Sequence, residues 1–300
     1  LGKFNVGITA GVETDASNPM WANTYCQNMD MVIVPSKHSK DSLLKHSSTS
    51  TPVHVVPESY FDEVLDEPES ELDLGLTTDF NFLTVGVLTG MTPDTDRKNL
   101  MYQIKWFVEN FKGNDNVGLV VKTNRGREST IDKKGTTTML KRLLREIGHD
   151  GTPKVYFLHG SMSNEEMTSL YKHPKIKALV SLTRGEGFGL PLLEASVAGL
   201  PVIATNWSSH KEFLDLGKWV KIDYDLEKIP ESRVDGQIFM KNSKWAFPRE
   251  EDFKKKITTF YEKPQKPREW AQKLSKKLTK KYSQESIEEL YDQVLSEVLG

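Results

Sequence analysis

The 300-residue sequence has one cysteine, no long apolar run and almost no net charge. Cys26 has no second cysteine with which to pair, so the chain cannot form an internal disulfide, as is typical of a reducing compartment. Apolar runs such as "VYFL" and "LVV" are far shorter than the ~20 residues of a membrane-spanning helix, and no signal peptide is visible. A formal charge of −2 gives no reason to expect a nucleic-acid partner. We therefore expect a cytoplasmic protein that binds no nucleic acid.

Two patterns that are typical of cofactor enzymes are also missing. The spacing of Cys and His does not indicate a metal site, so no metal is expected. A G-x-G-x-x-G turn after a first strand, with an acidic residue about 20 positions further on, does not occur, which argues against a dehydrogenase.

Short β-branched runs alternate with amphipathic segments of helical length along the whole chain. The clearest helix, 97–112, has one apolar stripe and is followed by Gly113, a typical C-terminal stop. Strands that alternate with helices indicate right-handed βαβ units, mainly parallel sheets and an α/β fold. The predicted strands are 4–10, 31–35, 53–57, 81–88, 117–123, 154–158, 177–182, 201–205 and 219–222, and the predicted helices lie near 18–28, 37–45, 97–112, 136–148, 163–172, 190–199, 208–215 and, with breaks, 250–299.

An acidic segment divides the chain. Residues 58–73 carry eight acidic side chains and no basic one, which is typical of a solvated linker. Because the chain starts at Leu1 without Met and has only three predicted strands before this linker, we interpret it as the later part of a longer protein. The predicted domains are a partial N-terminal Rossmann-like domain with linker over 1–75, a complete α/β domain over 76–282, and a C-terminal helix over 283–300 that packs back toward the N-terminal domain, with Ser283 as its N-cap.

The C-terminal segment 253–281 is strongly basic. It contains eleven Lys or Arg side chains and two Glu. Two interpretations are open: a solvated helix face, or peripheral contact with an anionic membrane surface or acceptor. Nothing else in the sequence separates them.

The segment "RGEGFGLPLLEA", residues 184–195, sets Glu186 in a glycine-rich turn and Glu194 in the helix that follows. The turn lies at the carboxyl end of the buried strand 177–182, the edge at which open parallel sheets bind ligands. With Pro191 at N1, the free amides of the helix N-terminus suit a phosphate. Two carboxylates beside a phosphate are explained if they accept hydrogen bonds from a sugar at one end of the ligand and a ribose at the other. The alternative is that Glu194 only complements the helix dipole and Glu186 is a loop charge.

The stretch "EGFGLPLLE" resembles the E-x(7)-E motif of retaining GT-B glycosyltransferases, the large family 4 often labelled group 1. The following "GLPVIATNWSSHKEFL" resembles a strand and loop of the same family, and the resemblance covers residues 4–300. It implies two Rossmann-like domains with parallel sheets, the first one incomplete here. It also implies a metal-independent retaining transfer, without a cofactor, of a sugar from a UDP- or GDP-linked nucleotide sugar to a hydroxyl of a glycan or lipid-linked glycan.

The resemblance further implies roles for individual residues. Glu186 would act at the donor sugar, while Arg97 and Lys122 would neutralise the diphosphate leaving group. Where many relatives carry a histidine near the donor sugar, this chain has Glu13, which either substitutes for it or is structural. His210 likewise either touches the donor or is a structural residue at a helix start. The predicted donor-binding residues are Lys98, Gly187, Phe188, Gly189, Leu190, Glu194, Glu13 and His210.

Three other functions are compatible with parts of the pattern. A glycoside hydrolase also needs two carboxylates, although it needs no anion site. A GT-B sugar-nucleotide epimerase shares the implied fold. A non-catalytic or truncated nucleotide-sugar-binding domain is favoured by the short N-terminal part.

Overall fold

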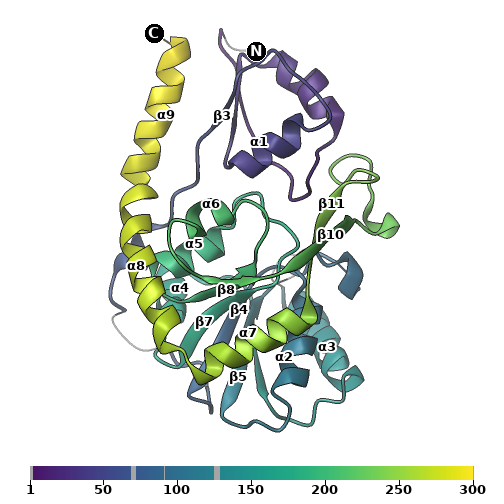
Figure 1. The fold of residues 1–300 in the computed structure, drawn as a ribbon, viewed down its shortest axis with the longest axis vertical. Helices are drawn as coiled ribbons and strands as arrows, with labels where there is room; N and C mark the ends of the chain where they lie inside the picture. Colours follow the sequence, from purple (N-terminus) through teal and green to yellow (C-terminus); the bar gives the residue numbers. More distant parts are fainter. Residues whose placement is uncertain (1–2, 69–71, 91, 125–128, 300) are drawn as a thin grey trace.

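The computed structural model describes residues 3–68, 72–90, 92–124 and 129–299 of the chain (Figure 1). Within these residues the strands form two parallel sheets and one antiparallel pair, which confirms the predicted α/β class. The larger sheet has its first strand in the middle, the order of a Rossmann-type sheet. The N-terminal sheet has the order β1 (Val6–Ile8), β2 (Met31–Val34), β3 (Val53–Val55), and the larger sheet the order β6 (Lys154–His159), β5 (Val117–Thr123), β4 (Phe80–Val85), β7 (Ile176–Ser181), β8 (Val202–Thr205), β9 (Val220–Ile222).

Helices cover both faces of the larger sheet (Figure 1). Successive residues of a strand point to opposite faces, and β4 accordingly contributes Leu83 to one apolar core and Phe82 to the other. The first core is covered by α5 and α8, and the second by α2 and α7. The helices are α1 (Lys37–Leu44), α2 (Leu100–Asn110), α3 (Thr130–Glu146), α4 (Asn164–Tyr171), α5 (Leu190–Val197), α6 (Lys211–Leu214), α7 (Glu250–Glu262), α8 (Gln265–Lys281) and α9 (Gln284–Leu299).

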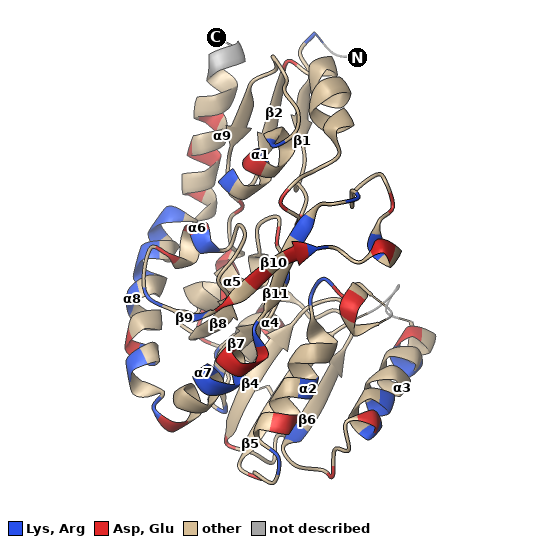
Figure 2. Cartoon of the chain, turned by 45° about the vertical axis from the view of Figure 1, so that its right-hand side comes forward, with Lys and Arg blue, Asp and Glu red and all other residues tan. Residues whose placement is uncertain are grey.

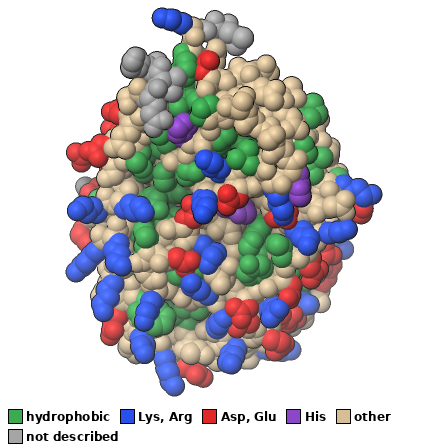
Figure 3. All heavy atoms as spheres, turned by 45° about the horizontal axis from the view of Figure 1, so that its top comes forward, with side chains coloured by type: hydrophobic (Ala, Val, Ile, Leu, Met, Phe, Trp, Pro, Cys, Tyr) green, Lys and Arg blue, Asp and Glu red, His purple; other side chains and the backbone are tan. Residues whose placement is uncertain are grey.

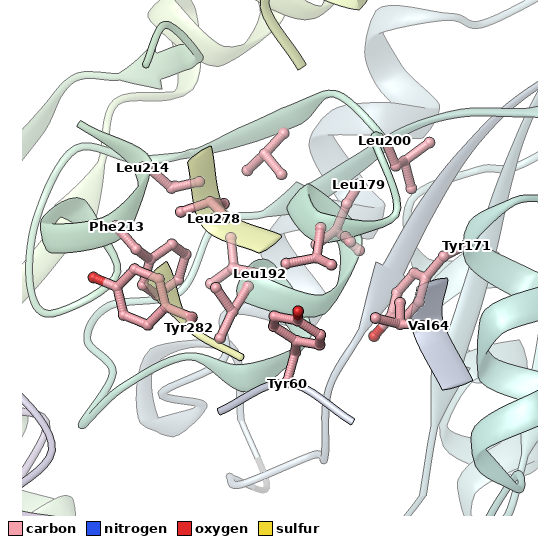
Figure 4. Packing of buried hydrophobic residues seen from close by; sticks show 14 of the residues in the cluster. Tyr60, Val64, Tyr171, Leu179, Leu192, Leu200, Phe213, Leu214, Leu278 and Tyr282 are labelled. Atoms are coloured by element: carbon pink, nitrogen blue, oxygen red, sulfur yellow. The ribbon is translucent and has the colours of Figure 1, made fainter. Parts of the chain in front are cut away.

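The acidic segment after β3 is not the solvated linker that its charge predicts. Tyr60 and Val64 are buried in the first core, Tyr60 beside Leu192 of α5 and Val64 beside Tyr171 (Figure 4). Val64 belongs to a 3-10 turn, Asp62–Leu65, and Lys172, directly after α4, donates to the carbonyl oxygens of Leu65 and Asp66. Apolar side chains spaced among the acids decide the path of this segment, because burying them outweighs the local surplus of charge.

Two predicted helices start at different residues because of their caps. The segment predicted as 97–112 becomes helical only at Leu100, since Asn99 is left-handed, with a φ of 57°, and Asp96 accepts a hydrogen bond of 2.8 Å from the Leu100 amide. The segment predicted as 136–148 already starts at Thr130, because Ser129 and Asp132 form a capping box.

Two further segments differ from the prediction. Residues 18–28 form a five-residue π-helix, Trp21–Tyr25, and a 3-10 turn, Cys26–Asn28, instead of one α-helix. The sequence also gave no sign of the antiparallel pair of β10 (Tyr224–Lys228) and β11 (Lys244–Pro248). β10 is mostly exposed and charged, so it has no apolar alternation, and its strand form depends on pairing with β11.

The C-terminal helices run from the larger sheet to the N-terminal sheet, with α9 beside β3 in Figure 1. The predicted N-cap Ser283 is confirmed, because its hydroxyl accepts a hydrogen bond of 3.2 Å from the Ser286 amide. Lys and Arg residues recur along α8 (Figure 2), and acidic side chains are interspersed with basic ones over the molecular face in Figure 3. No helix in the described part of the chain is both long and apolar enough to cross a membrane. Membrane contact through 253–281 stays a prediction.

Candidate functional site

The strand order of the larger sheet reverses between β4 and β7, which run side by side. In open parallel sheets such a reversal leaves a crevice beyond the carboxyl ends of the two strands, where ligands bind. The loop after β4 carries Arg97 and Lys98, and the loop after β7 carries Glu186. The topology therefore brings together residues that are 88 positions apart.

These three side chains form a charge cluster in which Glu186 is buried and the two cations are partly buried. The Lys98 ammonium donates to both carboxylate oxygens of Glu186, at 2.7 and 2.8 Å, and Arg97 Nη1 lies 3.4 Å from Glu186 Oε2. Arg97 Nη1 also donates to the Gly185 carbonyl oxygen at 2.6 Å. On its other side, Arg97 Nη2 lies 3.1 Å from Oε1 of Glu13, which comes from the N-terminal unit. Two cations are thus matched by two carboxylates.

The cluster keeps Glu186 ionised. Burial alone would raise the pKa of this carboxyl, but the charges of Lys98 and Arg97 and the hydrogen bond from Lys98 lower it to about 2. At neutral pH the side chain is therefore a carboxylate, which only accepts hydrogen bonds. This is the form that would bind the hydroxyl groups of a sugar.

The loop after β4 is held in place by Asp96, which sequence reasoning missed. Its buried carboxylate accepts hydrogen bonds from the Thr89 hydroxyl at 2.8 Å and from the Leu100 amide at 2.8 Å. The Thr89 hydroxyl in turn accepts from the Arg97 amide at 2.9 Å. An acidic residue just before the basic pair was the available sign of this role.

Arg184 is a second residue that the sequence analysis did not single out. It is fully buried, with its guanidinium 4.5 Å from the ring centroid of Phe247 in β11. The same group donates to the Pro93 carbonyl oxygen at 3.1 Å, to Asn99 Oδ1 at 3.2 Å and to the Asp94 carbonyl oxygen. Arg184 therefore ties the β7 loop to the β4 loop and to β11. Its place directly before the glycine-rich turn was the only sign of this in the sequence.

The N-terminus of α5 is arranged as an anion site would be. Gly189 is its N-cap with a φ of +103°, so Pro191 is the second residue of the helix, not the first as predicted. The Gly189 carbonyl oxygen accepts from the Leu192 amide at 2.9 Å. The amides of residues 187–190 make no hydrogen bond to another residue in the described part of the chain. Free amides at a helix N-terminus attract phosphate.

The second glutamate of the motif has a different partner. Glu194 Oε2 accepts a hydrogen bond of 2.8 Å from the hydroxyl of Tyr171, at the end of α4. Burial raises the pKa of Glu194, and this hydrogen bond opposes the rise. Among the residues that the structure describes, Glu186 and Glu194 therefore share no hydrogen-bond or ion-pair partner. That they bracket one ligand stays a prediction.

Lys122 lies at the carboxyl end of β5, next to β4 in the sheet. Its ammonium donates to the Gly160 carbonyl oxygen, after β6, at 2.5 Å. Lys122 therefore lies at the carboxyl edge of the sheet, as predicted, but it contacts the loop after β6, whereas Arg97 contacts the loop after β7.

Two predicted donor-binding residues face the protein interior. The Phe188 ring is buried, 5.5 Å from the Phe213 ring between centroids, which leaves only its backbone for a ligand. His210 is fully buried, with Nε2 2.7 Å from the Thr205 carbonyl oxygen. Burial lowers the His210 pKa, so the ring is neutral at pH 7. Of the two roles open for His210, this position favours the structural one.

The N-terminal unit packs directly on the glycine-rich turn. The hydroxyls of Ser36 and Ser39 lie 2.9 and 3.1 Å from the Gly187 carbonyl oxygen. Glu212 of α6 accepts hydrogen bonds from the Lys37 and His38 amides at the N-terminus of α1, at 3.0 and 2.9 Å. A carboxylate at this end of a helix is stabilising. The turn is therefore positioned from both sides of the molecule.

The close approach of the backbone at Ala10 leaves no room for a side chain at residue 187. A Cβ on Gly187 would lie 2.4 Å from the Ala10 carbonyl oxygen, a backbone atom that cannot rotate away. We expect Gly187→Ala to lower the free energy of unfolding, measured with urea, by about 1–3 kcal/mol. The control is Gly135→Ala in α3, where nothing lies within 4 Å and a gain of roughly 0.5–1 kcal/mol is expected. Equal stability of Gly187→Ala and the unchanged protein would contradict the described contact.

Several solved structures share this fold. A glycosyltransferase from Rickettsia africae superposes with a TM-score of 0.67 at 14% identity, over 98% of this chain and 70% of that chain. Anabaena Alr3699/HepE in complex with UDP and glucose gives 0.65 at 14% identity, over 90% of this chain and 64% of that chain. Sucrose-phosphate synthase from Thermosynechococcus elongatus gives 0.65 at 18% identity, over 90% and 60%. The chain thus covers less than two thirds of the latter two proteins. Their folds confirm the predicted GT-B type with Rossmann-like domains.

The sequence was also compared with curated proteins and with family models. No curated protein sequence matches the chain. The family described as "Glycosyl transferases group 1" matches residues 95–277, which include Arg97 and Lys98 at the end of the loop after β4 and the whole loop after β7. This match covers more than half of the chain and agrees with the fold, so the protein belongs to the glycosyl transferases group 1 family.

Proposed function

We propose that this protein transfers a sugar from a UDP- or GDP-linked donor to an acceptor hydroxyl of a glycan or lipid-linked glycan. The observation that carries the proposal is the ionised carboxylate of Glu186 between Lys98 and Arg97. It lies where the strand order reverses between β4 and β7, directly before the amides of residues 187–190, which make no hydrogen bond in the described part of the chain. The HepE structure contains UDP and glucose, and the pneumococcal O-GlcNAc transferase GtfA was solved with UDP and GlcNAc. Both support a nucleotide sugar as donor.

Each group at the site has a role in this reaction. The amides of 187–190 and the cations of Arg97 and Lys98 receive the diphosphate, and Lys122 adds positive charge at the same edge of the sheet. Glu186 accepts hydrogen bonds from the donor sugar, and Glu194 from the ribose. The bond between the anomeric carbon and the phosphate oxygen breaks, and the acceptor oxygen bonds to that carbon. The acceptor proton passes to the departing phosphate oxygen.

Two finer points of the proposal rest on the E-x(7)-E resemblance. Reaction on one face of the sugar, with the departing oxygen as base, retains the anomeric configuration. Side-chain cations at the leaving group allow the reaction to proceed without a metal. The anion site favours this reaction over glycoside hydrolysis, which needs none. The second candidate function is donor binding without turnover, since the groups with assigned roles all act on the donor.

Thermal unfolding with UDP, GDP and ADP tests the donor site. At one hundred times its Kd, a nucleotide that binds only the folded protein adds about 2.7 kcal/mol of stability. We expect a stabilising shift of the unfolding midpoint with UDP or GDP, and an affinity roughly tenfold lower in Glu194→Ala, the loss of about one hydrogen bond to a charged group. The matched control is Glu269→Ala on the exposed side of α8. If none of the three nucleotides shifts the midpoint, the donor site is refuted.

Release of free UDP or GDP on adding an acceptor would separate a transferase from an epimerase and from a pure binding protein.

A further inference from the structure

A cavity of about 620 Å³ lies at the amino ends of β7 and β8, the edge of the larger sheet opposite to the proposed donor site. The first residues of β7, the residue before β8 and one side of α8 line it. Val64, Tyr171 and Leu200 (Figure 4) give it largely apolar walls. Its volume lies within the range of small-molecule sites.

Two cations from distant parts of the chain line this cavity. Lys177 belongs to β7 and Arg268 to α8. Burial lowers the pKa of Lys177, and the charge of Arg268 lowers it further, so the two side chains lie close enough to repel each other. Asp79 acts in the opposite direction, but it is exposed and lies 3.1 Å from Lys175. An anion between the two cations would relieve their repulsion.

These cations have no acidic partner in the part of the chain that the structure describes. Glu67, the carboxylate among the described lining residues, is 92% exposed and lies 3.7 Å from Lys172. Lys177 donates to the Pro174 carbonyl oxygen, and an ammonium has three N–H donors. The guanidinium of Arg268 makes no hydrogen bond to another described residue. Donors on both side chains are therefore available to a ligand.

The C-terminal end of α5 also lies at this cavity, but it does not need the two cations. The last carbonyl oxygens of a helix carry partial negative charge and attract cations. Here the carbonyl oxygens of residues 194–196 accept hydrogen bonds from the amides of residues 198–200. The carbonyl oxygen of Val197 accepts one of 2.7 Å from the Ser275 hydroxyl of α8. Because the helix end is already satisfied, Lys177 and Arg268 remain for another anion.

The two positive charges indicate the chemical class of that anion. A phosphate monoester carries a charge of about −1.5 to −2 at pH 7 and offers three acceptor oxygens, whereas a single carboxylate carries only one charge. Gln272, one turn after Arg268 on the same side of α8, adds an amide donor. The apolar walls suit the carbon part of a small ester.

We propose that this cavity is a second anion site, which binds a small soluble phosphate monoester between Lys177 and Arg268. The site lies at the opposite end of α5 from the proposed donor site, and it does not depend on the proposed function.

Ligand-observed NMR on the full chain tests the proposal with glycerol 3-phosphate, inorganic phosphate and, as the uncharged counterpart, glycerol. We expect both phosphates to bind with a millimolar Kd at low salt and glycerol not to bind. Arg268→Gln and Lys177→Gln should each weaken phosphate binding about tenfold, the loss of one hydrogen bond from a charged group. Lys273→Gln, which removes an exposed charge from the same helix, should change it by less than about twofold.

Saturating UDP distinguishes this cavity from the donor site. Binding of glycerol 3-phosphate that persists with UDP present supports the inference, and displacement by UDP overturns it. The thermal midpoint without ligand shows that each variant is folded. Absence of binding for both phosphates overturns the inference, as does equal affinity in the unchanged protein and in folded Arg268→Gln and Lys177→Gln.

Vesicles of phosphatidylcholine with phosphatidic acid present the same phosphate monoester on a lipid. We expect Arg268→Gln and Lys177→Gln to sediment with these vesicles as the unchanged protein does. Sedimentation that both substitutions abolish, without binding of the soluble phosphates, would overturn the assignment to a soluble ligand.

Discussion

Replacement of Glu186 by glutamine is expected to lower turnover by about a hundredfold to a thousandfold while nucleotide affinity changes little. The variant keeps the shape of the side chain but loses the charge that accepts hydrogen bonds from the donor sugar. Lys98 and Arg97 then face a neutral amide, and both remain available for a diphosphate. Steady-state rates together with calorimetric titration of UDP or GDP measure the two quantities separately.

The controls for this variant are substitutions of the cations. Arg97→Ala and Lys122→Ala should weaken nucleotide binding and turnover together, because each removes a charge that would face the diphosphate in the bound and reacting states. Glu186→Gln also leaves two cations partly buried without their acid, a loss of roughly 3 kcal/mol that urea unfolding would detect. Unchanged turnover in a folded Glu186→Gln variant would reject the assigned role.

The sequence predicted those parts of the fold that depend on local pattern. The alternation of strands and helices indicated a parallel α/β architecture, and Ser283 was recognisable as a cap from its position alone. The glycine-rich turn was placed correctly at the carboxyl end of β7 because a buried strand directly precedes it. Each of these inferences needs only a few neighbouring residues.

The meeting of the two loops could not be predicted in this way. Strand order decides that β4 and β7 are neighbours, and strand order depends on packing across the whole sheet. The same reason explains why the pair of Lys98 with Glu186 and that of Tyr171 with Glu194 were not foreseen. The β10–β11 pair was missed because β10 is exposed and charged, so only its partner strand defines it.

The contact between the two units is also non-local. The Ser36 hydroxyl caps α1 and also donates to the Gly187 carbonyl oxygen. Glu212 of α6 accepts a hydrogen bond from the N-terminus of α1, which belongs to the N-terminal unit. Residues of the "PSKHSK" segment therefore help to shape the proposed donor loop although none was predicted to bind a ligand. Sequence pattern identifies the candidate ligand groups of this site more readily than the groups that orient them.

Arg184→Ala is expected to have the largest effect on stability, lowering the free energy of unfolding by about 4 kcal/mol. The substitution removes a fully buried guanidinium, its contact with the Phe247 ring and its hydrogen bonds to the β4 loop. Loss of each group of contacts costs about 1–3 kcal/mol. For a chain of this size we expect the midpoint of thermal unfolding to fall by roughly 8–16 °C.

Two further variants distinguish the role of Arg184 in orienting the site from its bulk. Arg184→Lys keeps a charge but lacks the planar fork, so it cannot reach Asn99 and the Pro93 carbonyl oxygen together and should recover less than half of the lost stability. Arg142→Ala on the exposed face of α3 should not shift the midpoint measurably. Because Arg184 orients the loop that carries Arg97 and Lys98, nucleotide affinity in Arg184→Lys should fall even at temperatures where the variant is folded. Full affinity in that variant would show that the loop after β4 keeps its shape without Arg184.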